Sequence, residues 1–148
     1  MMLLAFLIAT LAVCLHAILR GGAPERLTAL VFLAGLIGSI LASIGTRPTP
    51  AGFRLATFCV DVSMLLALAA VMLKARRYWP IAVTAMQLLS VMGHLIKLLD
   101  PNVATVLYWI TNAFWAVPQI AILEIATVRH IHRLRRFGGD PDWTARTS

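Results

Sequence analysis

Five long apolar runs, each with at most one charged residue in its interior, constrain the fold more than any other feature. Each run has about 20 residues, which is the length that a helix needs to cross the hydrocarbon of a bilayer. Short segments rich in glycine, proline and charged residues separate them. We therefore expect an all-α, polytopic membrane protein with five transmembrane helices, at residues 2–19, 27–45, 54–73, 79–99 and 103–127.

The composition excludes a water-soluble enzyme. Of the 148 residues, 60% are hydrophobic and only 13% are charged, which leaves too little polar surface to cover a soluble globule of this size. The net charge of +7 lies mainly in the joints and in the last twenty residues, where anionic lipid headgroups attract cations. We therefore expect membrane lipids as partners and no nucleic acid.

The distribution of the basic residues over the joints predicts an orientation. If the N-terminus is outside and the C-terminus is inside, only Arg47, Arg54 and Lys97 of the 13 lysines and arginines lie outside, and the other ten lie on the cytoplasmic side. The reverse topology inverts this ratio and violates the positive-inside rule. We expect residues 1–128 to form the transmembrane domain and residues 129–148 to form a basic cytoplasmic extension with a flexible tail.

Two groups of arginines are candidates for contact with lipid headgroups or with a partner. One follows the third run, next to an aromatic pair and a proline that mark the start of the fourth helix. The other lies along the cytoplasmic extension. The candidates are Arg76, Arg77, Arg129, Arg133, Arg135 and Arg136.

The second run has a face of small residues. Such rows let two helices approach closely in lipid, where apolar surface alone does not drive association. We expect this face to pack against another helix. Its members are Gly35, Gly38, Ser39, Ala42 and Ser43.

Polar residues in the third, fourth and fifth runs fall on one face of each helix and at similar depth. The members of this predicted intramembrane polar cluster are Arg54, Asp61, Gln87, His94 and Asn112. An ionised aspartate inside a bilayer costs at least about 2.5 kcal/mol, so Asp61 must face protein. His94 is the preferred partner, and Arg54 competes for that role. The cluster is either a hydrogen-bonded clasp between helices or part of a proton relay or solute-binding cavity.

The fifth run carries an aromatic face of Tyr108, Trp109 and Trp115. A flat quinone-like ligand, a lipid or a neighbouring subunit could stack on this face. Glu124, near the cytoplasmic end, can reach cytoplasmic water or pair with Arg20, Arg26 or Arg129, and we interpret it as part of an ion pair in preference to a catalytic acid.

His16 is the remaining candidate ligand. Ala12 lies one turn before it, which resembles the pattern that presents a histidine to a chlorophyll or haem metal. A buried histidine that donates a hydrogen bond to a neighbouring carbonyl is the favoured interpretation. We expect no other metal site and no disulfide, because Cys14 and Cys59 lie at different depths.

The segment Arg77-Tyr78-Trp79-Pro80, with Gln87, His94 and the aromatic residues of the fifth run, resembles small multi-span inner-membrane proteins of alphaproteobacteria. The resemblance covers about the last hundred residues. It implies the bacterial inner membrane as the location, and it implies no activity.

Three functional hypotheses follow. The first is a non-catalytic membrane subunit that packs against itself or against a larger inner-membrane complex. The second is a small carrier or channel component that handles a proton or a solute through Asp61 and His94. The third is a cofactor- or quinone-associated subunit of an electron-transfer or light-harvesting assembly. The sequence shows no catalytic residues and requires no cofactor, although bound lipid is expected.

Overall fold

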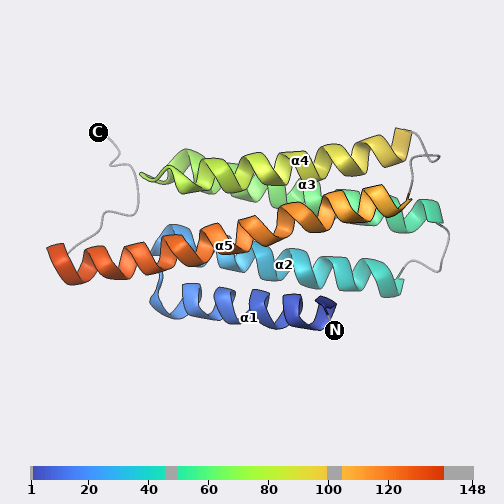
Figure 1. The fold of residues 1–148 in the computed structure, drawn as a ribbon. Helices are drawn as coiled ribbons and strands as arrows, with labels where there is room; N and C mark the ends of the chain where they lie inside the picture. The colour runs from blue at the N-terminus through green and yellow to red at the C-terminus, as the bar shows by residue number, and fades with distance from the viewer. Residues whose placement is uncertain (1, 46–49, 100–104, 139–148) are drawn as a thin grey trace.

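The described part of the chain, residues 2–45, 50–99 and 105–138 of a computed structural model, forms five helices (Figure 1). For residues 2–3, 45, 50–54 and 105–113 the structure describes the backbone alone. The helices are α1 Met2–Arg20, α2 Ala23–Gly45, α3 Pro50–Lys74, α4 Trp79–Leu99 and α5 Thr105–Phe137. The all-α prediction is confirmed, and the first four ranges agree with the expected runs to within four residues at each end.

The fifth helix is longer than the expected span at residues 103–127, because the basic extension at residues 129–137 continues it without a break as far as Phe137. Residues 128–137 contain no glycine or proline, so nothing ends the helix at the membrane boundary. Gly138 ends it: its φ is 68°, a conformation that glycine adopts without strain, and its N–H donates to the Leu134 carbonyl at 3.0 Å. The 33 residues of α5 span about 50 Å, well over the roughly 30 Å of a bilayer core. The tail at 139–148 lies outside the described residues.

The outer surface of the bundle has the character of a membrane protein. Among the described residues, three helices are long and apolar enough to cross a bilayer, at Ala23–Ile44, Leu55–Lys74 and Trp79–Leu99, and a shorter apolar helix covers Leu4–Arg20. The outward face of α1 is built from large aliphatic side chains. Its exposed members are Leu4, Ile8, Leu11, Leu15 and Leu19. Lipid covers such a surface well, whereas water does not.

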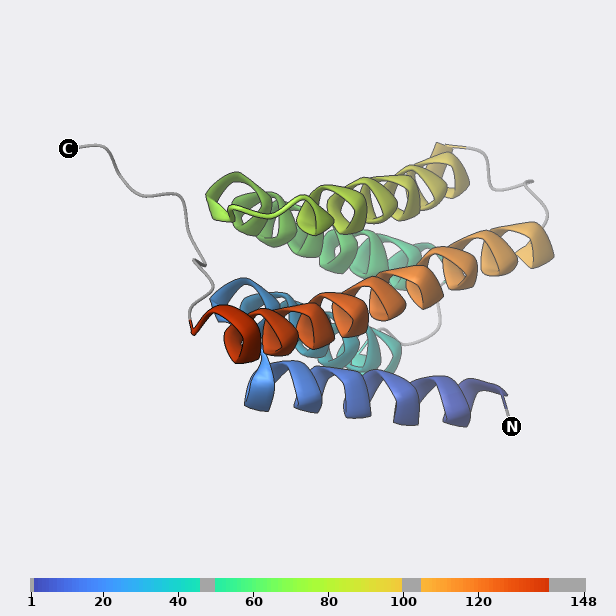
Figure 2. The same cartoon turned by 60° about the vertical axis from the view of Figure 1, so that its left-hand side comes forward.

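The five helices form a closed ring. Each helix packs against the next one in the sequence, and α5 returns to contact α1 and also α2. Figures 1 and 2 show from two directions that the helices run along a common axis. The end of the bundle where α1 begins is called the Met2 end here, and the opposite end is called the Arg20 end.

The apolar core lies nearer the Arg20 end of the ring. All five helices contribute to it, so this part of the bundle is closed. Towards the Met2 end the helices line a pocket that is partly open to the outside. The buried core residues are Cys14, Ala17, Ala29, Phe32, Leu68, Val83 and Leu123.

Helices α2 and α3 approach closely at the predicted small-residue face. A Cβ atom built on Gly35 would overlap the Met64 sulfur, and one built on Gly38 would lie 3.2 Å from Val60 Cγ2. Glycine is therefore required at position 35 unless Met64 moves. At Gly35 and Gly38 this face packs against α3 of the same chain.

We expect Gly38→Leu to lower the free energy of unfolding by about 1–3 kcal/mol, because the added carbons overpack the contact with Val60. Thermal unfolding in detergent measures this loss of stability. Ala34→Leu is the matched control: Ala34 lies one turn away and is exposed, so its enlargement should change stability by less than about 0.5 kcal/mol. Equal losses in both variants would show that close packing at Gly38 is not the cause.

Candidate functional site

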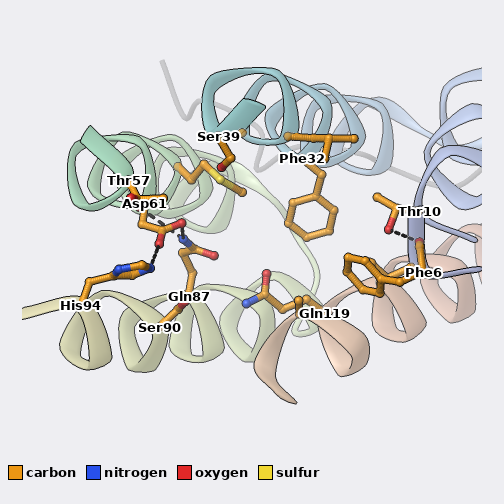
Figure 3. A pocket seen from close by; sticks show the side chains of 15 residues that line it. Phe6, Thr10, Phe32, Ser39, Thr57, Asp61, Gln87, Ser90, His94 and Gln119 are labelled. Atoms are coloured by element: carbon orange, nitrogen blue, oxygen red, sulfur yellow. Dashed lines mark hydrogen bonds and ion pairs between the residues drawn. The ribbon is translucent and has the colours of Figure 1, made fainter. Parts of the chain in front are cut away.

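A central pocket with a volume of about 370 Å³ lies inside the ring, towards the Met2 end (Figure 3). All five helices contribute to its wall. The lining residues are Phe6 and Thr10 from α1, Phe32, Gly35, Leu36 and Ser39 from α2, Thr57, Asp61 and Met64 from α3, Gln87, Ser90 and His94 from α4, and Ala116, Gln119 and Ile120 from α5. A volume of this size is in the range of small-molecule sites.

A hydrogen-bonded group of three side chains occupies one side of the pocket. His94 Nε2 lies 2.5 Å from Asp61 Oδ2. Gln87 Nε2 donates to Asp61 Oδ1 and to the Asp61 backbone carbonyl, both at 3.2 Å. The Asp61 and His94 side chains are only 17% and 9% exposed, so the carboxylate is shielded from lipid by the two α4 side chains that bind it. This is the arrangement that an intramembrane acid requires.

The pocket has a polar side and an apolar side. Figure 3 shows Asp61, His94 and Gln87 together on one side, with Phe32 and Phe6 away from them. The Thr10 hydroxyl donates to the Phe6 carbonyl at 2.8 Å, so it is satisfied by its own helix. A molecule that fills this space would place a hydrogen-bonding head near Asp61 and an apolar body near the two rings.

The structure brings together three of the five residues of the predicted polar cluster. Asp61, Gln87 and His94 are in contact, whereas the side chains of Arg54 and Asn112 lie outside the described residues. Lys97, one turn after His94 on α4, is buried as well. Ser90 shares a helix face with Gln87 in the sequence, and Gln119 shares one with Asn112. The structure places both Ser90 and Gln119 in the wall of the pocket.

The predicted aromatic and small-residue faces are only partly related to the pocket. Trp115 is half-buried and makes an edge-to-face contact with Phe114, with ring centroids 5.1 Å apart, and it does not line the pocket. The side chains of Tyr108 and Trp109 lie outside the described residues. Within the small-residue face, Ser39 lines the pocket. The two remaining members are Ala42, which is half-buried, and Ser43, which is exposed.

A buried charged group of Glu25, Arg77 and His130 lies at the Arg20 end. Arg77 Nη1 is 2.5 Å from Glu25 Oε1, and Arg77 Nη2 is 3.1 Å from His130 Nδ1. The Arg77 and Glu25 side chains are 4% and 0% exposed. The prediction that Arg77 lies among lipid headgroups is therefore wrong: a buried carboxylate on α2 draws the guanidinium into the protein, where charge-assisted bonds replace its hydration.

The other arginines of the two predicted contact groups are exposed, as a lipid or partner contact requires. These are Arg76, Arg129, Arg133, Arg135 and Arg136. Glu25 and His130 were not foreseen as members of a site. An acidic residue in the first turn of a helix is common because it favours the helix dipole, so the pattern around Glu25 carried no special signal.

His16 contacts Glu124 across the interface between α1 and α5. His16 Nδ1 lies 2.9 Å from Glu124 Oε1, and the two side chains are 35% and 36% exposed. The prediction that Glu124 pairs with an arginine is corrected, because packing of α1 against α5 sets His16 beside it. Ligation of a pigment or haem by His16 stays a prediction.

Within the described ranges, no group of three or more histidine, cysteine, aspartate or glutamate side chains could hold a metal ion. Cys14 is buried and Cys59 is exposed, and both are free thiols.

Comparison of the chain with known protein families, with curated proteins and with solved structures finds no match. The functional interpretation therefore depends on the pocket and on its hydrogen-bonded group.

Proposed function

We propose that the protein is a small solute-handling protein of the bacterial inner membrane, which binds an amphiphilic molecule in the central pocket and exchanges a proton through Asp61 and His94. One observation carries this proposal: a shielded carboxylate–imidazole pair forms part of the wall of a 370 Å³ pocket that all five helices line. Ionisable groups inside a membrane bundle commonly mark a path for ions or substrates.

The pair provides a means to link ligand binding to proton movement. His94 Nε2 and Asp61 Oδ2 lie 2.5 Å apart, so the imidazole N–H donates a hydrogen bond to the carboxylate. A ligand that donates to Asp61 competes with His94 for the carboxylate, whereas a ligand that accepts a bond competes with Asp61 for the imidazole N–H. In both cases binding replaces the bond between His94 and Asp61, and through this replacement we propose that ligand binding is linked to proton exchange, while Gln87 holds Asp61 in place through two bonds.

Binding in the pocket is favoured over a purely structural clasp by the space beside the pair. A clasp needs only the contact between α3 and α4, and close packing would fill the remaining volume. The wall also offers polar side chains from two further helices, Ser39 from α2 and Gln119 from α5, as well as Ser90 from α4. Convergent polar groups on an otherwise apolar pocket are typical of ligand sites.

We also propose five membrane crossings, with the N-terminus outside and the C-terminus in the cytoplasm. The apolar outward face of α1 and the length of α5 support two crossings in addition to those of α2, α3 and α4. At the Arg20 end, Arg20, Arg26 and Arg76 are exposed, which agrees with a cytoplasmic location for that end. The inner-membrane location follows from the resemblance noted in the sequence.

A pocket-filling variant tests the binding function. We expect a small molecule to co-purify with the wild-type protein in mild detergent and to be detected by native mass spectrometry. Ala116→Phe should remove it, because Ala116 lines the pocket. Ala121→Phe, on the exposed side of the same helix, is the matched control and should retain it. Retention of the molecule by folded Ala116→Phe protein, or its absence from wild type, would overturn the proposal.

A second candidate function is that of a subunit in a larger membrane complex. The observation that favours it is the C-terminal end of α5, which projects beyond the other helices in Figure 1. Its last turns expose Arg133, Arg135, Arg136 and Phe137, which suits a cytoplasmic partner or anionic headgroups. However, Gly35 and Gly38, which were expected to pack against a partner, already contact α3. A stoichiometric second protein in the same mass spectra would support this candidate.

A further inference from the structure

A second cavity lies beside the central pocket, between α2 and α3. Its volume is about 330 Å³, and it is lined by Val31, Ala34, Gly35, Gly38, Cys59, Val60, Ser63, Met64 and Ala67. Ala34, Cys59 and Ser63 are exposed at the outer surface of the bundle. In a bilayer this groove faces the acyl chains.

Gly35 and Met64 line both cavities. The wall between the groove and the central pocket therefore consists of the Met64 side chain lying against a backbone that has no side chain of its own. A Cβ atom at position 35 would occupy the place of the Met64 sulfur, so this place is available to Met64 only because residue 35 is glycine.

Methionine suits a movable wall. Its unbranched side chain has three rotatable bonds and adapts to irregular spaces, and Met64 is only half-buried. Rotation of Met64 away from Gly35 would join the two cavities without displacement of a helix. Rotamer changes of this kind are fast compared with movements of whole helices.

We infer that Met64 and Gly35 form a lateral gate, through which a small lipid-soluble amphiphile passes between the bilayer and the central pocket. This inference rests on the proposed binding function and names the class of ligand. The lining of the groove is mainly apolar, so it favours a molecule already dissolved in lipid over a hydrophilic solute from water. The polar head of that molecule then meets Asp61, His94 and Gln87 on the far side of the gate.

Thiol labelling in liposomes tests the gate without the natural ligand. Ser39 lines the central pocket and not the groove, so Ser39→Cys reports on the pocket interior. The background carries Cys59→Ser, which removes the exposed thiol and leaves the buried Cys14. The probes are lipid-soluble N-phenylmaleimide and a charged, membrane-impermeant methanethiosulfonate. The Cys59→Ser protein without the Ser39→Cys substitution measures the background labelling.

We expect N-phenylmaleimide to label the Ser39→Cys thiol faster than the charged reagent does. Added Met64→Ala should raise the N-phenylmaleimide rate by about tenfold, which corresponds to removal of about 1.4 kcal/mol of steric barrier. Met64→Trp should lower it. Met92→Ala, an exposed methionine on α4, is the matched control and should leave it unchanged.

Two results would overturn the gate. Either the Met64 variants leave the labelling rate unchanged, or the charged reagent labels as fast as the lipid-soluble one, which would mean that the pocket fills from water. Both results can occur while Ala116→Phe still removes a co-purifying molecule, so failure of the gate is distinguishable from failure of the binding function.

Discussion

Arg77→Ala is expected to lower the free energy of unfolding by about 3–5 kcal/mol, the cost that follows removal of one partner of a buried ion pair. Arg77 and Glu25 are almost fully buried, and Arg77 also contacts His130. The group therefore joins α2, the segment between α3 and α4, and α5 at the Arg20 end. Thermal or denaturant unfolding in detergent, followed by tryptophan fluorescence, measures the loss.

Arg76→Ala is the matched control for this prediction. The two arginines are neighbours in the sequence, but Arg76 is exposed, so its removal should change the free energy of unfolding by less than about 0.5 kcal/mol. The double variant Glu25→Gln with Arg77→Met should recover much of the stability, since both charges leave the interior together. Equal behaviour of Arg76→Ala and Arg77→Ala would contradict a buried role for Arg77.

The second large effect is expected for the double variant Asp61→Asn with His94→Gln, which should abolish the pH dependence of ligand binding. If binding exchanges one proton with the Asp61 and His94 pair, the Kd of the co-purifying molecule changes by about tenfold for each pH unit over the titration range. The amide groups that replace the carboxyl group and the imidazole in this double variant do not ionise, so the slope should fall to zero while the fold is retained. Titration calorimetry in detergent over a series of pH values measures the slope.

Other charged groups must be considered in this experiment. Lys97 lies one turn after His94 on α4 and is buried, and the half-exposed pair of His16 and Glu124 lies between α1 and α5. His16→Gln is therefore the control: it removes an imidazole that contacts a carboxylate outside the pocket lining, and it should leave the slope unchanged. A slope that survives the double variant would assign the proton to another group and remove the Asp61 and His94 pair from the mechanism.

Much of the fold could be predicted from the sequence because the bilayer simplifies the problem. A helix that crosses hydrocarbon must satisfy its own backbone hydrogen bonds, so long apolar runs translate directly into helices such as α4, whose bounds match the expected range. The pairing of Asp61 with His94 was expected for a related reason. An acid in this position needs a polar partner at its own depth, and helical geometry leaves few candidates.

Other features depended on how the helices meet, which helical periodicity does not specify. The sequence pattern assigned Arg77 to the lipid headgroups, whereas in the structure Glu25 holds its side chain inside the protein. Which of these two locations Arg77 takes depends on how close α2 lies to the segment before α4. In the same way, Glu124 contacts His16 because α5 returns to α1. From the sequence alone, Arg20, Arg26 and Arg129 were equally suitable partners for Glu124.

The amino-acid sequence by itself determined the helical class, the approximate helix bounds and the inward direction of the polar stripe, because each of these follows from the cost of placing a polar group in hydrocarbon. Only the tertiary structure decided that the helices close into a ring, that the ring leaves a pocket beside Asp61, and that Gly35 and Met64 line both this pocket and the outer groove. The physical reason is that contacts between helices depend on the shapes of many side chains at once, whereas the helices themselves depend on local composition.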